Sequence, residues 1–236
     1  KFKPNVISIC SPTEKHLEHI LKCNNYGNYI IVEKPFIYPK KNKKITNTYK
    51  IASNILANLR KKIVINLPMV SLGNQLIKKK ETSNKIKNLK FMYYTKGKQT
   101  YDNIAIDLLP HAIVFLLTIN KSLLKSYEIK SVTKNKSDWS CKMKINNTIC
   151  HFLFKQSTAR KESNLFFKIN KNYYERKQKL LNGEYVTTLI KNKKKIINVK
   201  NPMTEYLNLL LKNFKNPKAI GRNHRLTLDI TRLTDK

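Results

Sequence analysis

The sequence predicts two kinds of fold in one chain: an α/β unit with a doubly wound parallel sheet, then an α+β unit with a large, mostly antiparallel open sheet. Residues 6–67 alternate short apolar runs with amphipathic helical stretches, which is the order of a parallel sheet covered by helices. Residues 126–199 contain closely spaced segments rich in Tyr, Phe, Ile and Thr, which is typical of antiparallel strands. The 236 residues suffice for two modest domains, which we place at 1–70 and 71–236.

A strand, a helix and a second strand open the chain. Val6–Cys10 predicts a strand buried on both faces, because an unbroken run rich in β-branched residues is typical of such strands. Pro12 lacks an N–H and ends that strand, and Thr13 can cap a helix that begins at Glu14. Apolar residues at helical spacing follow, and Tyr29–Val32 predicts the second strand. This order is one βαβ unit.

The two strands of this unit should be parallel, so both end at the same edge of the sheet. Ser11 and Pro12 therefore lie beside the segment Glu33-Lys34-Pro35, at the edge where open α/β sheets bind their ligands. The chain must leave a buried strand and turn at once there. A turn of that kind favours a cis Lys34–Pro35 bond, since an X–Pro bond has only a small trans preference.

The motif Ser-Pro-Thr-x-x-His at 11–16, followed after the next strand by Glu-Lys-Pro at 33–35, resembles the Gfo/Idh/MocA family. These proteins are NAD(P)-dependent sugar and polyol oxidoreductases with a Rossmann domain. The resemblance implies NAD or NADP as cofactor and a small-molecule sugar or polyol as substrate. Taken alone, Lys34 could be a solvated loop lysine and His16 a helix-surface histidine, but their order and the spacing of the elements favour the family.

The resemblance also implies roles at this edge of the sheet. The family's lysine lies between the nicotinamide and the substrate, which implies a catalytic role for Lys34. The cofactor-binding residues that the resemblance implies are Ser11, Pro12, His16, Glu33, Lys34 and Pro35.

A second stretch with chemical content is the helix predicted over 101–119. Asp107 and His111 are four residues apart, so they share one face of that helix. The family has Asp-x-x-x-His here, which implies that His111 takes the substrate hydroxyl proton and that Asp107 orients it. This chain departs from the family by lacking its glycines, and Pro110 is tolerated only in a first helical turn. Asp107 could therefore instead be the N-cap residue, and His111 an interface histidine.

The remaining elements follow from periodicity. Residues 45–59 predict an amphipathic helix, 63–67 a further buried strand, and 207–214 a terminal amphipathic helix, while 71–88 carry little information. Asn146-Asn147 and Asn170-Lys171 look like hairpin turns. The strands predicted for the second domain are Leu89–Thr95, Tyr127–Thr133, Trp139–Ile145, Thr148–Lys155, Asn164–Ile169, Asn172–Gln178, Val186–Lys191 and Lys195–Val199.

One expected motif is missing. No Gly-x-Gly-x-x-Gly occurs in the sequence, although a complete dinucleotide-binding domain places it in the first βα turn, with an acidic ribose-binding residue about 20 residues later. We expect both to precede Lys1, in which case this chain is a fragment, one piece of a split gene or a degenerate homologue. On that expectation, residues 1–236 alone bind NAD(H) or NADP(H) poorly.

The net charge of +34 is extreme and comes from 42 lysines and six arginines against 14 acidic residues. The lysines are spread along the whole chain, and A/T-rich codons would produce this bias without any function in nucleic-acid binding. A nucleic-acid binder more often gathers Lys and Arg on one face with aromatic residues among them. The charge should still attract anionic substrates and cofactors.

The four cysteines form no Cys-x-x-Cys pair, so no metal or redox motif is visible. This cysteine usage fits a reducing cytoplasm, and no signal-peptide pattern is present. The longest apolar stretch, 104–119, contains Asp107, Pro110 and His111 and is expected to be too short and too polar to span a membrane.

These observations together predict an NAD(P)-dependent oxidoreductase that transfers a hydride between nicotinamide and the hydroxyl carbon of a sugar, nucleotide sugar or polyol. Two alternatives stay open: a catalytically inactive remnant of such an enzyme, and a basic module that binds nucleic acid or another anionic polymer. The resemblance further implies a homo-oligomer formed through the β-sheet domain.

Overall fold

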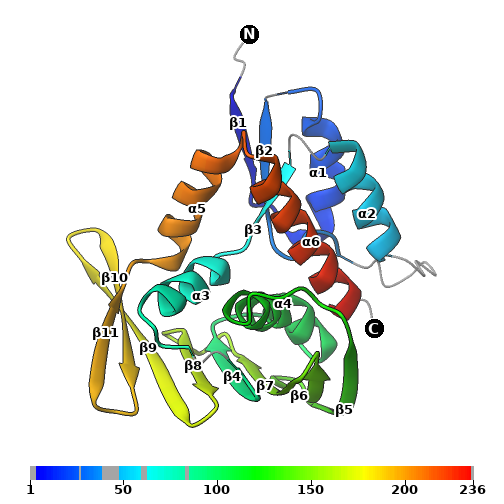
Figure 1. The fold of residues 1–236 in the computed structure, drawn as a ribbon. Coiled ribbons are helices and arrows are strands. Elements are labelled where there is room, and N and C mark those ends of the chain that lie inside the picture. The colour runs from blue at the N-terminus through cyan, green and yellow to red at the C-terminus, as the bar shows by residue number, and fades with distance from the viewer. Residues whose placement is uncertain (1–3, 27, 39–47, 60–62, 83–84, 235–236) are drawn as a thin grey trace. The chain divides into compact units, whose positions relative to one another are not determined.

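The structure is a computed structural model, and it describes residues 4–26, 28–38, 48–59, 63–82 and 85–234. The chain divides into two compact units (Figure 1). The first unit combines Lys1–Leu67 with Tyr206–Lys236, and the second is Pro68–Glu205. The first boundary lies close to the predicted one, whereas the last 31 residues, which we had assigned to the second domain, cluster with the first unit.

The first unit contains a three-stranded parallel sheet in the order β1-β2-β3, as predicted. Its central strand β2 is buried from Ile30 to Val32, and it is apolar on both faces, as is typical of a strand in a parallel sheet. The elements are β1 (Val6–Ile9), η1 (Thr13–Lys15), α1 (His16–Cys23), β2 (Tyr29–Glu33), α2 (Thr48–Leu59), β3 (Ile63–Asn66) and α6 (Pro217–Thr234), with α5 (Pro202–Asn213) leading into the unit.

Strand β1 corrects one prediction. It is an edge strand among the described residues, where only Ile9 of the strand is buried and Cys10 is exposed rather than a core residue. Thr13 is also not a cap: it is the first residue of the short helix η1, and no side-chain hydrogen bond caps that helix. An apolar run shows that a strand is present, but it does not show whether a neighbouring strand covers its edge. The expected basic turn at 40–44 lies outside the described residues.

The other edge of this sheet is closed by side chains of α6. The backbone N–H of Ile65 donates to Asn223 Oδ1 (2.9 Å), and Asn223 Nδ2 donates to the Ile65 carbonyl (2.8 Å) and to the Tyr206 hydroxyl (2.8 Å). His224 Nε2 donates to the Ile63 carbonyl at 2.7 Å, and burial lowers the pKa of this histidine. A buried amide thus satisfies backbone groups of β3 that no further strand pairs with.

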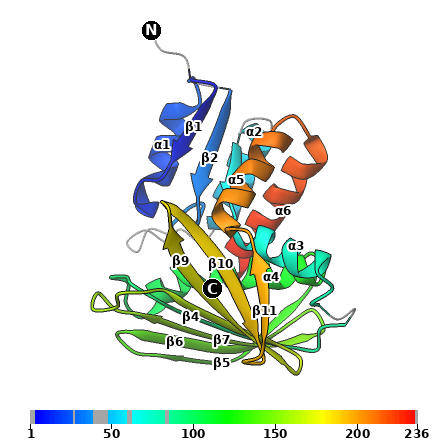
Figure 2. The ribbon, with the colours of Figure 1, turned by 90° about the vertical axis from the view of Figure 1, so that its left-hand side faces the viewer.

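The second unit contains an eight-stranded sheet in the order β11-β10-β9-β8-β4-β7-β6-β5, antiparallel except where β4 pairs with β7. Every predicted strand is present within a few residues of its predicted ends, and Asn146 and Asn170 take the positive φ of tight hairpin turns. Figure 2 shows β9, β10 and β11 rising at one side of this sheet. The strands are β4 (Asn88–Thr95), β5 (Tyr127–Lys134), β6 (Asp138–Ile145), β7 (Thr148–Gln156), β8 (Asn164–Ile169), β9 (Asn172–Leu181), β10 (Glu184–Lys191) and β11 (Lys195–Val199).

Two helices of this unit pack against each other: α3 (Met69–Lys78) and α4 (Asp102–Ile119). The contact needs Gly73, because a Cβ there would lie 2.8 Å from Thr118 Cγ2. Phe115 of α4 packs against Phe91 and Phe167 on the sheet, with ring centroids 5.7 and 4.8 Å away. Helix α3 was not predicted, since polar residues interrupt its apolar positions.

Helix α4 also differs from expectation. It begins at Asp102, so Asp107 is in its interior and is not the N-cap, and Pro110 is inside the helix rather than in its first turn. The reason is burial: most of the helix is enclosed, and this packing outweighs the backbone bond that a proline removes. Among the described residues, α4 alone is long and apolar enough to cross a membrane, against our expectation for this stretch, but 72% of it is buried in the protein.

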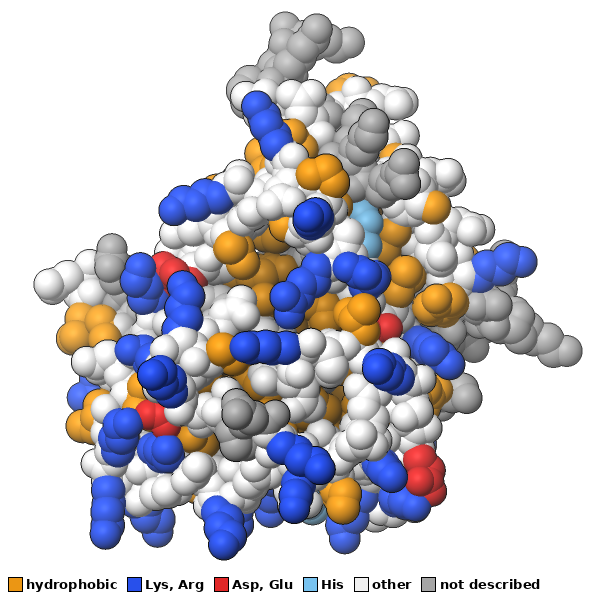
Figure 3. All heavy atoms as spheres, viewed as in Figure 1, with side chains coloured by type: hydrophobic (Ala, Val, Ile, Leu, Met, Phe, Trp, Pro, Cys, Tyr) orange, Lys and Arg blue, Asp and Glu red, His pale blue; other side chains and the backbone are white. Residues whose placement is uncertain are grey.

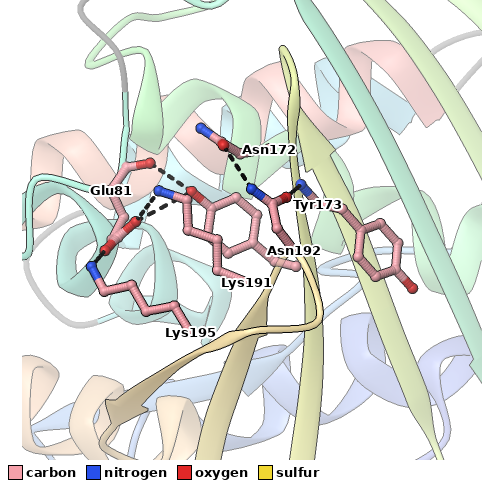
Figure 4. Close-up of polar contacts among 7 residues, drawn as sticks. Glu81, Asn172, Tyr173, Lys191, Asn192 and Lys195 are labelled. Carbon is pink, nitrogen blue, oxygen red and sulfur yellow. Dashed lines mark hydrogen bonds and ion pairs between the residues drawn. The ribbon is translucent and has the colours of Figure 1, made fainter.

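The buried carboxylate of Glu81, which precedes β4 in the chain, bonds to side chains of β10 and β11. Glu81 accepts hydrogen bonds from Lys191 (2.7 Å) and Lys195 (2.6 Å), and the Tyr174 hydroxyl donates to the Glu81 carbonyl at 2.9 Å (Figure 4). Burial by itself raises the pKa of Glu81, but the two lysines outweigh it and the net pKa is lowered. The ionised carboxylate therefore stabilises the folded state.

Candidate functional site

The first candidate site is the carboxyl edge of the parallel sheet. His16 is buried at the start of α1, and its ring lies between two turns: Nδ1 is 2.9 Å from the Pro35 carbonyl and Nε2 is 2.9 Å from the Ser11 carbonyl. Carbonyl oxygens only accept, so the neutral ring donates one of these bonds and the protonated ring donates both. Through His16, the turn that follows β1 and the turn that follows β2 lie side by side, as the βαβ order predicted.

Further polar contacts fix the same edge. Asn66, the last residue of β3, donates from Nδ2 to Glu33 Oε1 at 2.6 Å, which links the ends of β2 and β3. His19 Nδ1 is 2.9 Å from Ser11 Oγ, a contact that the sequence analysis did not anticipate. Lys34 is half-buried at the end of β2, and the Lys34–Pro35 bond is cis, which confirms that prediction.

This edge has the chemistry that the nicotinamide end of a dinucleotide needs. Pro12 offers exposed apolar surface, Ser11 a hydroxyl, and Lys34 a cation, all on turns that hydrogen bonds hold in place. The residues of this sequence do not provide the usual pyrophosphate site. That site is a Gly-x-Gly-x-x-Gly turn, which brings a helix N-terminus to the phosphates, and the sequence contains no such motif.

The second candidate site is a cavity of about 700 Å³ in the Pro68–Glu205 unit. His111 of α4 lies in its wall, with Tyr93 of β4 and Arg176 of β9. The Tyr93 ring touches both of them: the His111 ring meets it edge-on at 5.5 Å, and the Arg176 guanidinium lies over it at 5.7 Å. A proton acceptor, an aromatic platform and a cation therefore share one wall of the cavity.

Asp107 lies one helical turn before His111, as the spacing predicted. Its Oδ2 accepts a 2.6 Å hydrogen bond from Gln156 Nε2, and Gln156 Oε1 in turn accepts from the Gln99 N–H at 3.1 Å. Gln156 is buried and lies so close to Gly97 that a Cβ there would be 2.3 Å from Oε1. The amide thus fixes the orientation of the Asp107 carboxylate, which makes Gln156 a positioning residue.

Sequence reasoning missed Tyr93, Gln156 and Arg176. For Gln156 there was no signal, because a glutamine at the end of a strand is ordinary. For Arg176 there was a signal. It lies two residues after Tyr174 in β9, so both side chains point to the same face of the sheet, which should be apolar. Lys34 and His111 belong to different units, and their convergence on one cleft stays a prediction.

The described residues contain no group of three His, Cys, Asp or Glu side chains that could hold a metal ion. All four cysteines are free. Burial raises the pKa of Cys141 to about 11 and that of Cys150 to about 12, so neither is a thiolate near neutral pH. Among the described residues, the cavity wall includes the ionisable side chains of His111 and Arg176.

The segment that matches a protein family contains the first of these two candidate sites. Residues 1–60 match the sequence profile GFO_IDH_MocA, described as an oxidoreductase family with an NAD-binding Rossmann fold. The predicted resemblance and its nicotinamide cofactor are thereby confirmed for the segment that carries Ser11, His16 and Lys34. No curated protein matches the chain.

Solved structures resemble the fold over nearly the whole chain. A dehydrogenase (MviM) from Clostridium difficile has a TM-score of 0.65 at 14% identity, over 98% of this chain and 77% of its own. UDP-N-acetylglucosamine 3-dehydrogenase GnnA from Acidithiobacillus ferrooxidans has a TM-score of 0.62 at 14% identity, over 98% and 76%. The 3-ketoreductase KijD10 from Actinomadura kijaniata, solved with TDP-benzene and NADP, has a TM-score of 0.67 at 10% identity, over 98% and 76%. The chain thus has the two-domain fold of these oxidoreductases. At 10–14% identity, the likeness shows the fold alone.

Proposed function

We propose that this protein is an NAD(P)-dependent oxidoreductase that acts on the hydroxyl-bearing carbon of a sugar or sugar derivative. The observation that carries the proposal is the ring of His16, which holds the Ser11 and Pro35 turns together at the carboxyl edge of the parallel sheet. This edge lies within the 60 residues that match the oxidoreductase family. It includes Lys34, to which the resemblance assigns the position between nicotinamide and substrate.

In the proposed mechanism, His111 and Lys34 act on the oxygen of the reacting carbon. Nicotinamide, when bound, supplies or accepts the hydride. His111 accepts the proton of the substrate hydroxyl, a task for which an imidazole is suited near neutral pH. Lys34 donates a hydrogen bond to the same oxygen and stabilises the negative charge that develops there. Asp107, held by Gln156, orients the side chain of His111 from one turn away.

The test is transfer of deuterium from nicotinamide labelled at C4 to a sugar product, measured by mass spectrometry on the full-length protein. A panel of keto-sugars and nucleotide keto-sugars serves as acceptors, with both NADH and NADPH. Lys34→Ala should reduce transfer about 100-fold or more while leaving the circular dichroism spectrum unchanged. The matched control is Lys22→Ala, because Lys22 is an exposed lysine of the same unit that pairs only with Glu18 on the helix surface.

Two outcomes would count for the alternatives. Absence of deuterium transfer with every acceptor, together with retained fold, would favour an inactive remnant. Retention on DNA or heparin that falls steeply with salt would favour the polyanion-binding module. Figure 3 supports the enzyme over that module, because Lys and Arg side chains are spread over the face in view and do not gather into a stripe.

The oligomeric state and the cytoplasmic location stay predictions. We propose that copies associate through the outer face of the eight-stranded sheet, which carries exposed apolar side chains such as Ile149 (62% exposed). Light scattering coupled to size exclusion tests this, and Ile149→Lys should then shift the protein towards the monomer.

A further inference from the structure

Arg176 has an unusual environment for an arginine. The residue has a relative exposure of only 8%, yet its buried Nε has no hydrogen-bond partner in the structure. Among the described residues no carboxylate forms an ion pair with it, and its guanidinium lies over the face of the Tyr93 ring at 5.7 Å. Buried arginines keep their charge, and a buried cation is normally paired because desolvation is costly.

The surroundings of Arg176 are also positive rather than neutralising. The cavity wall contains Lys161, Lys177 and the single acidic residue Glu162. Lys177 is paired with Glu175 on the same strand, whereas Arg176, which also lines the cavity, projects to the opposite face of β9. A guanidinium in this position has five donors and an aromatic support that fixes its plane, which is the arrangement that binds planar or tetrahedral oxyanions.

We propose that Arg176 binds an anionic group, a carboxylate or a phosphate, on the sugar substrate of this protein. The proposal rests on the function proposed above and specifies its substrate class as charged carbohydrates. Arg176 and His111 both contact the Tyr93 ring, so an anionic group bound by Arg176 would set the position of the hydroxyl that His111 deprotonates.

The first experiment is isothermal titration of the full chain with three probes: glucose, glucuronate and glucose 6-phosphate. One of the two anions should bind about 10- to 100-fold more tightly than glucose, and which anion does so distinguishes the carboxylate from the phosphate. Arg176→Gln should remove that difference, and Arg176→Lys should restore part of it, because lysine keeps the charge without the planar fork. The control Lys179→Gln removes the same charge from the same strand outside the cavity wall and should leave the affinities unchanged.

A second measurement separates a ligand-binding arginine from a structural one. Since the native structure gives Arg176 no ionic partner, Arg176→Met should leave the melting temperature unchanged or raise it, while removing the preference for the anion. A fall of several degrees would show that the arginine supports the fold and would overturn the proposal. Equal binding of all three probes, no binding of either anion, or equal effects of Arg176→Gln and Lys179→Gln would overturn it as well. Anion binding through Arg176 without deuterium transfer would contradict the proposed reaction alone.

Discussion

Three buried polar side chains, two in the first unit and one in the second, differ in how their polar atoms are satisfied. In the first unit, His16 and Asn223 are buried and each bonds backbone groups of its own unit, so that they fix turns and a strand edge. In the second unit, Arg176 is almost as buried but its Nε has no partner in the protein. Buried polar groups that are satisfied stabilise a structure, and those that are not either destabilise it or await a ligand. The comparison therefore separates residues that hold the fold from one that we assign to the substrate.

The largest expected effect is at Asn223. Asn223→Ala leaves both the N–H and the carbonyl of Ile65 without a partner in a buried position, and it also removes a bond to the Tyr206 hydroxyl. We expect the free energy of unfolding to fall by about 3 kcal/mol. Urea denaturation measures this, with Asn213→Ala as the control, because Asn213 bonds only an exposed helix carbonyl. Equal losses for the two variants would contradict the role of Asn223 as the closure of the β3 edge.

His16 should come next. His16→Ala removes the bridge between the Ser11 and Pro35 carbonyls, and we expect a loss of about 2 kcal/mol in unfolding free energy. The deuterium transfer defined above should also fall, because the turn that carries Lys34 loses its support. His151→Ala is the control, since this histidine lies in β7 of the other unit. A variant that keeps both stability and transfer would show that the bridge is dispensable.

Two helical glycines should change the free energy of unfolding by less, and in opposite directions. Gly73→Ala places a methyl group 2.8 Å from Thr118 Cγ2, and this overpacking of about 1–3 kcal/mol should exceed the roughly 1 kcal/mol that alanine adds in helix propensity. Gly221 in α6 has open space around its Cα, so Gly221→Ala should stabilise by about 0.5–1 kcal/mol. Opposite shifts in melting temperature are therefore expected, and shifts of the same sign would show that α3 and α4 are not packed as described.

The smallest expected effect is on how stability depends on pH in the acidic range. The pKa of Glu81 is lowered by Lys191 and Lys195, so its stabilising contribution is present above the unfolded pKa of about 4.5 and is lost as the pH falls below it. Glu81→Gln should flatten the dependence of stability on pH in that acidic range, as measured by urea denaturation at a series of pH values. Glu14→Gln, at an exposed position, should leave the slope unchanged. An unchanged slope in Glu81→Gln would mean that the ionised carboxylate contributes nothing.

The sequence contained most of the fold. Alternation and asparagine turns predicted all the strands of the second sheet, because period-two patterning and turn chemistry are local properties. Burial was harder to predict. The apolar run at Val6–Ile9 is an edge strand among the described residues, and Pro110 lies inside α4. A local pattern shows neither the neighbours of a strand nor the packing around a helix.

The candidate site divides along the same line. Ser11 and Lys34 on the turns, and His16 at the start of α1, could be predicted to lie near this edge because a βαβ unit fixes where its strands end. Gln156 and Arg176 could not, because they reach Asp107 and Tyr93 from strands distant in sequence, and only the strand order brings them together.

The central claim is that Lys34 and His111 act on one substrate oxygen, and a double-mutant cycle of deuterium transfer tests it most directly. The variants are Lys34→Ala, His111→Asn and the two combined, all assayed on the full-length protein with the same acceptor. If both side chains act on the same oxygen, the double variant should be little slower than the slower single variant, because residues that act as a unit are strongly non-additive. Losses of about 100-fold in each single variant that multiply to about 10,000-fold in the double variant would show that the two residues act independently, and would contradict the account.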